Sequence, residues 1–582
     1  MKNWDLNDLY HGFDDAYERD LKKLEDKMDD LKNYILYQKQ ENDMQYIEGY
    51  IKREEEIVRL SRSLGAFASL TMATDVNHEV APRYMAKLQQ IFRKVTAEQV
   101  IFQRYLASVD LNKVKEHSSL IRKYLYLLKK DQEDATHLLS EKEEVLYSKM
   151  REFASSGWSQ LHSITTANLP VDFEGKEITL SEIRNLAYDN DKDIREKAYH
   201  AELKAYEKIE DQVAFALSNI KREVTTMNDL RGYESALSKT LTQSNMTKAT
   251  LDAMIEAMLE YRPYFAAYLK EKAAYLGHKG SLPFYDLFAP VGNLTKTYTY
   301  EEAQKIIKDA FYGYSKRLGD FATKAFDHNW IDPFPKKGKR GGAFCSNQPQ
   351  IKQSRILSNF TGSLSDVLTL AHELGHGYHG EVIADNDPLH WSYPMPLAET
   401  ASIFCETIVN NYLLKSLKKD EEKLSVLENS LQGDTQVIID ILSRYMFESK
   451  LFENATGPIN KKQMKEWMLE AQKEAYTDGL DHEVLHPYMW LNKGHYYSAG
   501  LSFYNFPYAF GLLFGKGLYA AYLKDPDKFL LHYDHLLELT TKTSVEEVAK
   551  TMDIDVTSKD FWISSLEQVK KDIDEVILLF KK

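Results

Sequence analysis

Cysteine is scarce in this chain, since Cys345 and Cys405 are the two cysteines among 582 residues. A secreted protein that depends on disulfides carries many more, so two thiols fit a reducing compartment better than an oxidising one. Residues 1–20 also contain no apolar segment of the kind that a secretory signal peptide requires. We therefore expect a cytoplasmic protein.

Long hydrophobic runs are missing as well. The most apolar stretch, residues 506–523, is interrupted by Pro507 and Lys516 and falls short of an unbroken membrane span of about 20 apolar residues. We expect it to form a buried helix, because 43% of the chain is hydrophobic and a large core is available. Basic residues are outnumbered, with 74 Lys and Arg against 88 Asp and Glu. The resulting net charge of −14 disfavours nucleic acid and anionic membranes as partners.

Strand-like alternation is rare, and helical periodicity dominates instead. Apolar residues recur at steps of three and four between residues 13 and 35, and the same spacing returns in several later segments, which indicates amphipathic helices. Two segments favour strands. One is residues 169–182, with a turn at Glu174-Gly175 followed by a capped helix, and the other is residues 341–360.

The predicted fold class is therefore mainly α, with a small β-sheet beside the histidine-rich motif described next. We expect two lobes. Residues 1–200 would form an N-terminal helical lobe that includes a hairpin near residues 170–180, and residues 201–582 would form a second lobe. The chain shows no internal repeat and no low-complexity tract.

The segment LTLAHELGHGYHG, residues 368–380, contains the pattern H-E-x-x-H. On a helix, His372 and His376 share one face and can bind one metal ion, and the carboxylate of Glu373 can approach a water on that ion. Two imidazoles with a carboxylate favour Zn²⁺ among the physiological metals. The sequence therefore predicts a zinc site on this helix.

Two glycines interrupt the same segment. Gly375 and Gly377 each cost a helix about 1 kcal/mol relative to alanine. We expect another backbone or a substrate to approach the helix closely at these positions. The alternative, a purely structural helix with hydrogen-bonded histidines, would rarely accept both glycines.

A catalytic zinc site needs three protein ligands and an open position. His379 lies seven residues beyond His372, about 10 Å along an unbroken helix, and is out of reach of the ion. Three roles stay open for His379. It could lie beside the site without binding the ion, face the substrate, or be a polar side chain with its own hydrogen bond. In residues 394–414, Glu399 and Glu406 fall on one face among apolar neighbours. Glu399 would be the third ligand, and Glu406 would accept a hydrogen bond from a ligating histidine.

Hydrogen-bond donors for the oxyanion formed during peptide hydrolysis are abundant in residues 492–511. A phenol donates a hydrogen bond while it stays neutral at pH 7, and a histidine can donate as well. Spacing does not choose among the donors, and aromatic core packing is the other role open to the tyrosines. The candidates are His495, Tyr496, Tyr497, Tyr504 and Tyr508.

Three motifs, AHELGHGYH, PLAETASIFCE and KGHYYSAGLSFYNFPYAFG, occur in this order and together resemble the oligoendopeptidase F family, bacterial relatives of thimet oligopeptidase. The similarity extends along nearly the whole chain, from WDLNDLY near the N-terminus through GKRGGAFC at residues 338–345. The resemblance implies a zinc metalloendopeptidase that cuts short peptides inside a deep channel between two helical lobes.

The resemblance also implies roles for single residues. One Zn²⁺ per chain would be bound by His372, His376 and Glu399. Glu373 would be the general base, which takes a proton from water and returns it to the leaving amine. Glu406 matches the acid that supports a zinc ligand.

Other matched residues would face the substrate. His495, Tyr504 and Tyr508 would be catalytic residues close to the substrate carbonyl. The segment Gly342, Ala343 and Phe344 matches an edge strand that pairs with the substrate backbone, a mode of binding that tolerates many side chains. We expect Tyr497 to contact the substrate as well.

Two other functions remain open. The protein could trim peptides from a chain end, as a carboxypeptidase or dipeptidase of the same zinc architecture. It could also be a non-catalytic helical scaffold that binds peptides. The sequence leaves open the cleavage preference, the limits on peptide length, the physiological substrate and the oligomeric state.

Overall fold

The computed structural model describes residues 3–38, 42–292 and 296–582. A series of helices precedes the first strand. The apolar repeat predicted a helix from residue 13 onward, and α1 follows it, with its apolar face buried and Asp14 as its N-cap. The helices before the first strand are α1 (Asp15–Tyr37), α2 (Asp43–Thr74), α3 (Ala81–Arg93), α4 (Thr96–Ala107), α5 (Leu111–Val114), α6 (Ser119–Lys123), α7 (Leu125–Ala135), α8 (Glu141–Arg151) and α9 (Ser155–Ala167).

The predicted hairpin is confirmed. Strands β1 (Val171–Phe173) and β2 (Lys176–Ile178) pair antiparallel. Glu174 and Gly175 both have positive φ, which is the backbone conformation that a two-residue hairpin turn requires. The capped helix that follows is α10 (Leu180–Asn185).

A second group of helices leads to the small sheet. These helices are α11 (Lys192–Tyr206), α12 (Glu210–Leu230), α13 (Ala236–Gln243), α14 (Lys248–Tyr275), α15 (Tyr300–Tyr314) and α16 (Lys316–Asp327). The sheet has the strand order β3-β5-β4, formed by β3 (Ile331–Asp332), β4 (Phe344–Gln348) and β5 (Gln353–Leu357). The pair β4–β5 is antiparallel, as residues 341–360 predicted, and β3 adds a short parallel strand that the sequence did not indicate.

The remaining chain is again helical and contains the H-E-x-x-H motif in α17, against which β4 and β5 pack. A π-helical turn, η6 (Gln436–Asp440), joins α20 to α21. The helices of this part are α17 (Leu364–Ile383), α18 (Met395–Ala398), α19 (Thr400–Ser416), α20 (Asp420–Thr435), α21 (Ile441–Glu453), α22 (Lys461–Tyr476), α23 (Phe506–Lys524), α24 (Pro526–Leu539), α25 (Val545–Lys550) and α26 (Lys559–Phe580).

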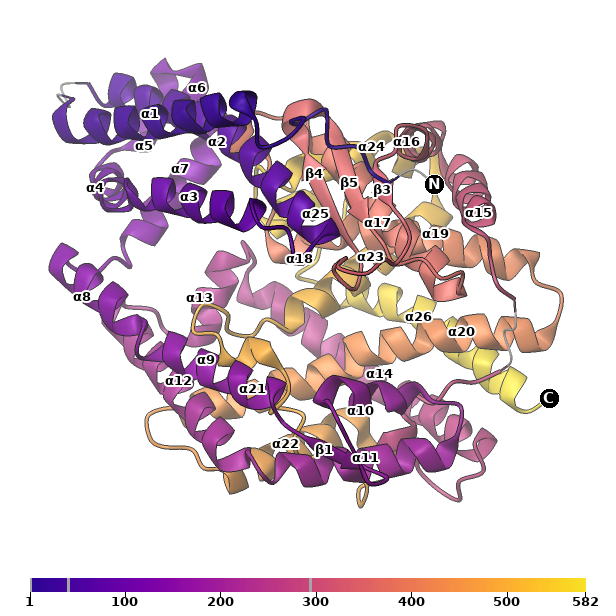
Figure 1. The fold of residues 1–582 in the computed structure, drawn as a ribbon. Coiled ribbons are helices and arrows are strands. Elements are labelled where there is room, and N and C mark those ends of the chain that lie inside the picture. The colour runs from indigo at the N-terminus through magenta and orange to yellow at the C-terminus, as the bar shows by residue number, and fades with distance from the viewer. Residues whose placement is uncertain (1–2, 39–41, 293–295) are drawn as a thin grey trace.

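The buried apolar residues form one large cluster, one smaller cluster and a third group of four, in which Trp4, Leu70 and Ala73 meet Leu357 of β5. The smaller cluster lies in residues 10–128 and holds the N-terminal helices together. The larger one begins at Leu169 and continues to Leu579. In Figure 1, α1–α4 lie at one corner beside the sheet, while α9–α12, α21 and α22 lie on the opposite side of the molecule. The division into lobes at residue 200 stays a prediction, whereas the mainly helical class with a small sheet is confirmed.

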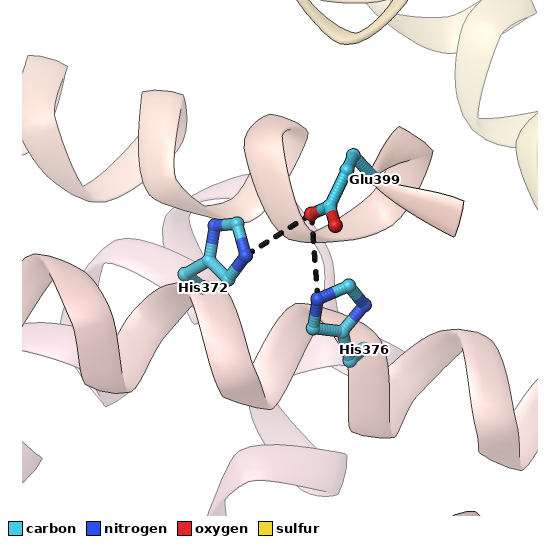
Figure 2. A group of neighbouring side chains, drawn as sticks. All are labelled: His372, His376 and Glu399. Carbon is cyan, nitrogen blue, oxygen red and sulfur yellow. Dashed lines mark ion pairs between the residues drawn. The ribbon is translucent and has the colours of Figure 1, made fainter. Parts of the chain in front are cut away.

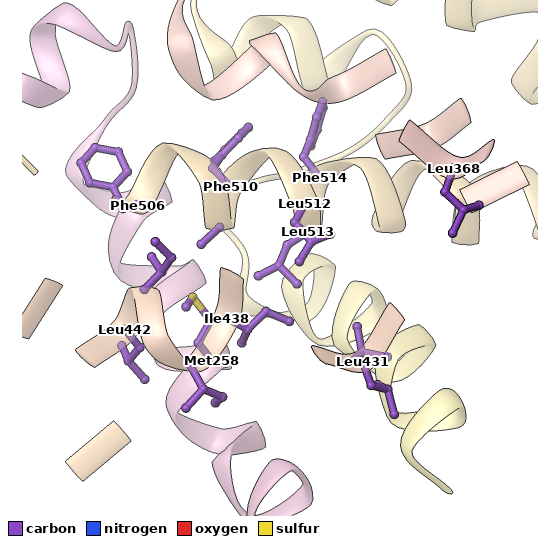
Figure 3. Packing of buried hydrophobic residues seen from close by; sticks show 14 of the residues in the cluster. Met258, Leu368, Leu431, Ile438, Leu442, Phe506, Phe510, Leu512, Leu513 and Phe514 are labelled. Carbon is purple, nitrogen blue, oxygen red and sulfur yellow. The ribbon is translucent and has the colours of Figure 1, made fainter. Parts of the chain in front are cut away.

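The apolar stretch at residues 506–523 forms the buried helix α23, as predicted. Its Phe510 and Phe514 contact Trp562 and Phe561 of α26. Leu512 and Leu513 lie on the side of α23 that faces Leu431 and Ile438 (Figure 3). Within the described residues, we find no helix that is both long and apolar enough to cross a membrane.

Candidate active site

The helix that carries the H-E-x-x-H motif has a firmly fixed start. Ser363 caps α17, and Asp366 completes a capping box. One carboxylate oxygen of Asp366 accepts hydrogen bonds from the backbone N–H groups of Thr361, Gly362 and Ser363. Since the first turn is held in this way, the histidines two turns later occupy a defined face of the helix.

Gly375 of the motif lets the backbone of a second helix approach closely, as predicted from the sequence, and Gly377 makes room for the ring of Phe321. A Cβ atom placed on Gly375 would lie 2.6 Å from the carbonyl oxygen of Ala401 and from Cα of Ser402, so α17 touches the backbone of α19. Gly511 on α23 allows Glu399 to come equally close, because a Cβ atom on Gly511 would lie 2.6 Å from Cβ of Glu399. Glycine at positions 375 and 511 therefore brings Glu399 next to the histidines.

Three potential metal ligands converge at this contact. Glu399 lies at the junction of α18 and α19, and its Oε2 lies 3.1 Å from Nε2 of His372 and 3.4 Å from Nε2 of His376 (Figure 2). One ligand atom from each of these three residues lies within 4.8 Å of the others. Ser402, one turn later, donates a hydrogen bond of 2.7 Å to the same Glu399 oxygen. Two imidazoles and one carboxylate in this arrangement are the donor set of a catalytic zinc site.

The second ring nitrogen of His372 also has an acidic partner. Nδ1 lies 3.0 Å from Oε2 of Glu406, so Glu406 orients the ring and keeps Nε2 directed at the site. Burial lowers the pKa of His372, but the hydrogen bonds to Glu399 and Glu406 outweigh it and raise the pKa to about 10. Burial alone would raise the pKa of Glu399, yet the hydrogen bonds from His372 and His376 hold it far below its ordinary value. The carboxylate of Glu399 is therefore ionised and ready to bind a cation.

Glu373 lies beside these ligands and is only 7% exposed. Its Oε2 has no hydrogen-bond partner among the described residues, and the backbone N–H of Cys345 on β4 donates to its carboxylate. Burial raises the pKa of Glu373. A buried carboxylate with an unpartnered oxygen needs a proton donor, and a water held by a metal ion at the neighbouring ligands would supply one. The residues present thus fit a zinc ion.

His379 faces away from the ligands. It is fully buried, its Nε2 lies 2.8 Å from the hydroxyl of Thr540, and its ring stacks on Tyr393. Burial lowers its pKa to about 3. Of the three roles left open by the sequence, the structure favours that of a polar side chain with its own hydrogen bond.

The three expected substrate-facing donors form a second group. His495 lies in the short helix η8 (Gly494–Tyr497), its ring centroid is 6.1 Å from that of Tyr504, and the rings of Tyr504 and Tyr508 are 5.5 Å apart. Burial, together with the charge of Arg444, lowers the pKa of His495 to about 3, so its ring is neutral at pH 7. Its Nε2 has no hydrogen-bond partner among the described residues.

This second group is electrostatically linked to the ligands. Burial and a hydrogen bond with Tyr504 raise the pKa of Tyr508, and the negative charge of Glu399 adds to the effect. Tyr508 is 38% exposed and belongs to the first turn of α23, the helix that also carries Gly511. The phenol of Tyr508 is therefore neutral, accessible and close to the candidate metal ligands.

The expected substrate residues have different surroundings. Gly342 is exposed with a φ of 80°, and Ala343 and Phe344 are half-buried where β4 begins. Since β4 is an outer strand of the described sheet, one of its backbone edges is not paired with another strand of that sheet. Tyr497 is fully buried, stacks on His162 and donates to the carbonyl of Trp490 at 3.4 Å. The structure places Tyr497 in the core, and we do not retain it as a substrate residue.

Several contributors to the site were not found from the sequence. The backbone N–H of Cys345, the close approach of Gly511 and two of the cations that act on His495, Lys221 and Arg444, come from distant segments. Of these contributors, only Gly511 had a signal in the sequence. Residues 506–523 contain several glycines, and glycine is unfavourable inside a helix unless another group must come close. Lys221 and Arg444 had no signal in local spacing.

Two bacterial proteins are similar to this chain along its whole length. The oligoendopeptidase F homolog of Lactococcus lactis subsp. lactis (strain IL1403) is 23% identical over 602 residues, covering 100% of this chain and 97% of the relative. Oligopeptidase PepF of Bacillus subtilis (strain 168) is 21% identical over 594 residues, covering 100% of this chain and 87% of the relative.

Solved structures share the fold. A crystal structure from Chlamydophila abortus gives a TM-score of 0.85 at 22% sequence identity, covering 99% of this chain and 98% of the other. Oligoendopeptidase-F from Enterococcus faecium gives a TM-score of 0.71 at 17% identity, covering 97% of this chain and 99% of the other.

The model of peptidase family M3 matches residues 185–568. This span covers more than half of the chain and includes the candidate ligands, the buried glutamate and the histidine and tyrosines of the second group. The chain belongs to peptidase family M3.

Proposed function

We propose that the protein is a zinc-dependent endopeptidase that hydrolyses internal bonds of short peptides. The observation that carries this proposal is the convergence of His372, His376 and Glu399 beside the buried carboxylate of Glu373. Membership of peptidase family M3 supports it, as do the names of the relatives in Lactococcus lactis and Bacillus subtilis, an oligoendopeptidase and an oligopeptidase.

Zinc would be held by Nε2 of His372, Nε2 of His376 and the carboxylate of Glu399, one ion per chain. When bound there, Zn²⁺ supplies Lewis acidity, which polarises the peptide carbonyl and lowers the pKa of the attacking water. Glu406 holds the ring of His372 in the orientation that this role requires.

Glu373 acts as general base and then as general acid. Its Oε2 accepts a proton from the attacking water, and the same proton passes to the amine of the leaving peptide. The N–H of Cys345 keeps the carboxylate in place during both transfers. Because burial raises the pKa of Glu373, its protonated form is less unfavourable than that of an exposed glutamate.

The second group stabilises the oxyanion that develops on the carbonyl. Tyr508 and Tyr504 are neutral donors, and the neutral ring of His495 can donate one N–H without adding a charge. The unpaired edge of β4 would bind the substrate backbone by strand addition, with Gly342, Ala343 and Phe344 at its entrance.

Mapping of cleavage positions tests the endopeptidase assignment. A peptide of about ten residues, acetylated at its N-terminus and amidated at its C-terminus, is incubated with the zinc-loaded enzyme, and the products are identified by mass spectrometry. The proposal predicts cleavage at internal bonds of this blocked peptide. Cleavage only after a free end is restored would indicate a carboxypeptidase or dipeptidase, and the absence of any cleavage would favour a peptide-binding scaffold.

We also propose a cytoplasmic location and peptides as the substrates. Cys345 and Cys405 are both unpaired, which suits a reducing compartment. Fractionation of the producing cells, followed by immunodetection, tests the location.

A further inference from the structure

None of the candidate zinc ligands lines a small cavity that lies next to a larger one. The small cavity measures about 100 Å³ and is bordered by α10 and α11 on one side and by η6 and α21 on the other. Tyr188, Phe288 and Gln436 line both this cavity and a neighbouring one of about 610 Å³, and Glu406 lines the larger one. The two cavities are therefore neighbours, and the larger one extends to the acid that orients His372.

The small cavity is lined by four basic side chains, Arg184, Arg195, Arg444 and Lys493, and by two carboxylates, Glu202 and Asp440. Arg184 lies 3.4 Å from Glu202, and Arg444 pairs with Asp440. Arg195 pairs with Asp286, which does not line the cavity, and Nε of Arg195 lies 2.8 Å from Oδ1 of Asp286. This pairing leaves one lysine of the lining, Lys493, without a carboxylate partner among the described residues.

Lys493 is half-buried, and this burial makes an unpaired ammonium costly. Burial and the nearby charge of Arg444 lower the pKa of Lys493 to about 7. Its pKa would return toward its ordinary value if an anion occupied the cavity, because an opposite charge within a few ångström favours the protonated amine. The cavity thus presents a cation that lacks a counter-ion.

Arg444 offers a second free donor in the same place. It is 8% exposed, and its Nε has no hydrogen-bond partner among the described residues. Its side chain reaches the cavity from α21, directly after the π-helical turn η6, two of whose residues, Gln436 and Asp440, also line the cavity. Such π-helical turns occur frequently at functional sites.

The position of Lys493 links the cavity to the peptide. Lys493 precedes His495 by two residues, and its charge acts on the ring of His495, which the proposed function places beside the substrate carbonyl. A peptide whose reacting carbonyl lies beside His495 would therefore have the cationic cavity close by.

We propose that Lys493 and Arg444 form a subsite that binds a carboxylate of the peptide substrate, either its C-terminal carboxylate or an acidic side chain. The assignment rests on the proposed peptidase function and adds a substrate preference to it. One unmatched positive charge suits one carboxylate, and a hydrogen bond between two charged groups is stronger than one between neutral groups. The subsite would favour short peptides whose carboxylate reaches the pocket while an internal bond lies at the zinc ligands.

Binding measurements test the subsite without requiring turnover. The full-length, zinc-loaded Glu373→Gln protein is titrated with three versions of one fluorescent peptide. These are a free acid, a C-terminal amide and an amide with glutamate as its last residue. The free acid or the glutamate peptide should bind about tenfold or more tightly than the plain amide. The version that does so identifies the source of the carboxylate.

Substitutions then locate the effect. Lys493→Met in the same background should bring the ratio of affinities for the carboxylate-bearing peptide and the plain amide close to one, whereas Lys493→Arg should retain a preference. Lys239→Met is a matched control, because Lys239 is also a half-buried lysine whose pKa burial lowers, and it lines neither cavity. The control should leave the ratio unchanged.

Two results would overturn the subsite. The first is equal binding of all three peptides to the protein that carries Lys493. The second is a carboxylate preference that survives in Lys493→Met. Failure of the peptidase assignment is distinguishable, because it would appear as absent cleavage by the enzyme that retains Glu373, whatever the binding ratios are.

Discussion

At the scale of single residues, His372 depends on two carboxylates, one at each ring nitrogen. Glu399 faces Nε2 and Glu406 faces Nδ1, both within 3.1 Å. The ring therefore cannot rotate without losing one of these partners. An imidazole held in this way is oriented for a metal before the metal binds, which reduces the ordering cost of binding.

Glu406 is predicted to act on zinc affinity. Replacement of Glu406 by Gln removes the charged acceptor at Nδ1 of His372 but keeps the side-chain volume. We expect zinc affinity to fall about 10- to 100-fold. Competition with a fluorescent chelator measures this change, and circular dichroism verifies that the variant is folded. Unchanged zinc affinity would show that Glu406 does not support the ligand.

Glu373 is predicted to act on chemistry and not on metal binding. Glu373→Gln cannot accept the proton of water, so kcat for a quenched peptide should fall by at least about 100-fold. Zinc content, measured by atomic emission, should stay at one ion per chain because the three ligands remain. Turnover within a few-fold of the parent enzyme would contradict the role of general base.

The residues of the site differ in how far their placement followed from the sequence. His372, Glu373 and His376 share one helix, and their relative positions follow from helical geometry. Glu399 and Glu406 required the additional inference that a second helix packs alongside. Tyr497 shows the limit of this reasoning, since spacing does not distinguish a tyrosine of the core from one that faces a substrate.

At the scale of elements, the close contact of α17 with α19 holds the ligands together. Gly375→Ala places a Cβ atom 2.6 Å from the backbone of α19, so the two helices must separate. We expect a loss of about 1–3 kcal/mol in the free energy of unfolding and a weaker affinity for zinc. Denaturant titration and chelator competition measure the two effects.

A glycine in open space provides the control for that substitution. Gly65 lies inside α2 and has no atom within 4 Å of its would-be Cβ. Gly65→Ala should be neutral or stabilise the protein by up to about 1 kcal/mol, since alanine favours a helix. A Gly375→Ala variant as stable as Gly65→Ala would contradict the tight contact between α17 and α19.

The connection between α17 and α18 contains an acid-sensitive residue. His390 is 1% exposed, packs against Tyr124 and has no hydrogen-bond partner at either ring nitrogen among the described residues. Burial, followed by repulsion from Lys542, lowers its pKa from 6.5 to about 4. Between these two pH values the unfolded chain binds a proton that the folded chain does not, so stability falls as the pH falls.

His390→Phe should remove this sensitivity. At pH 5 the neutral buried histidine costs about 2 kcal/mol relative to pH 7.5, and phenylalanine fills a similar space without a titrating group. We expect the Tm of the variant to rise relative to that of the parent protein on going from pH 7.5 to pH 5. A Tm difference that is the same at both pH values would contradict the assignment.

At this scale, the helices and strands that could be predicted from the sequence were the long ones and those with a clear local signal. Helix α1 and the hairpin β1–β2 were predicted because periodicity and a turn at Glu174-Gly175 are local features. Strand β3 was missed because it has two residues and pairs with β5 in parallel, so its partner lies beyond a long connection.

At the scale of the whole molecule, the chain brings together groups that no local pattern relates. Arg184, Arg444 and Lys493 come from three distant segments and meet at one cavity. The two larger apolar clusters likewise divide the chain in a way that periodicity did not reveal, with one in residues 10–128 and one from Leu169 onward, while a third, small cluster joins Leu70 to Leu357. Such arrangements depend on tertiary packing, which is why sequence patterns alone did not predict them.

The most direct test of this account is anomalous X-ray diffraction from crystals of the zinc-loaded protein, with data collected on both sides of the zinc absorption edge. The account predicts one anomalous peak per chain, located between Nε2 of His372, Nε2 of His376 and the carboxylate of Glu399. An anomalous peak elsewhere, or no peak in a protein that hydrolyses peptides, would contradict it.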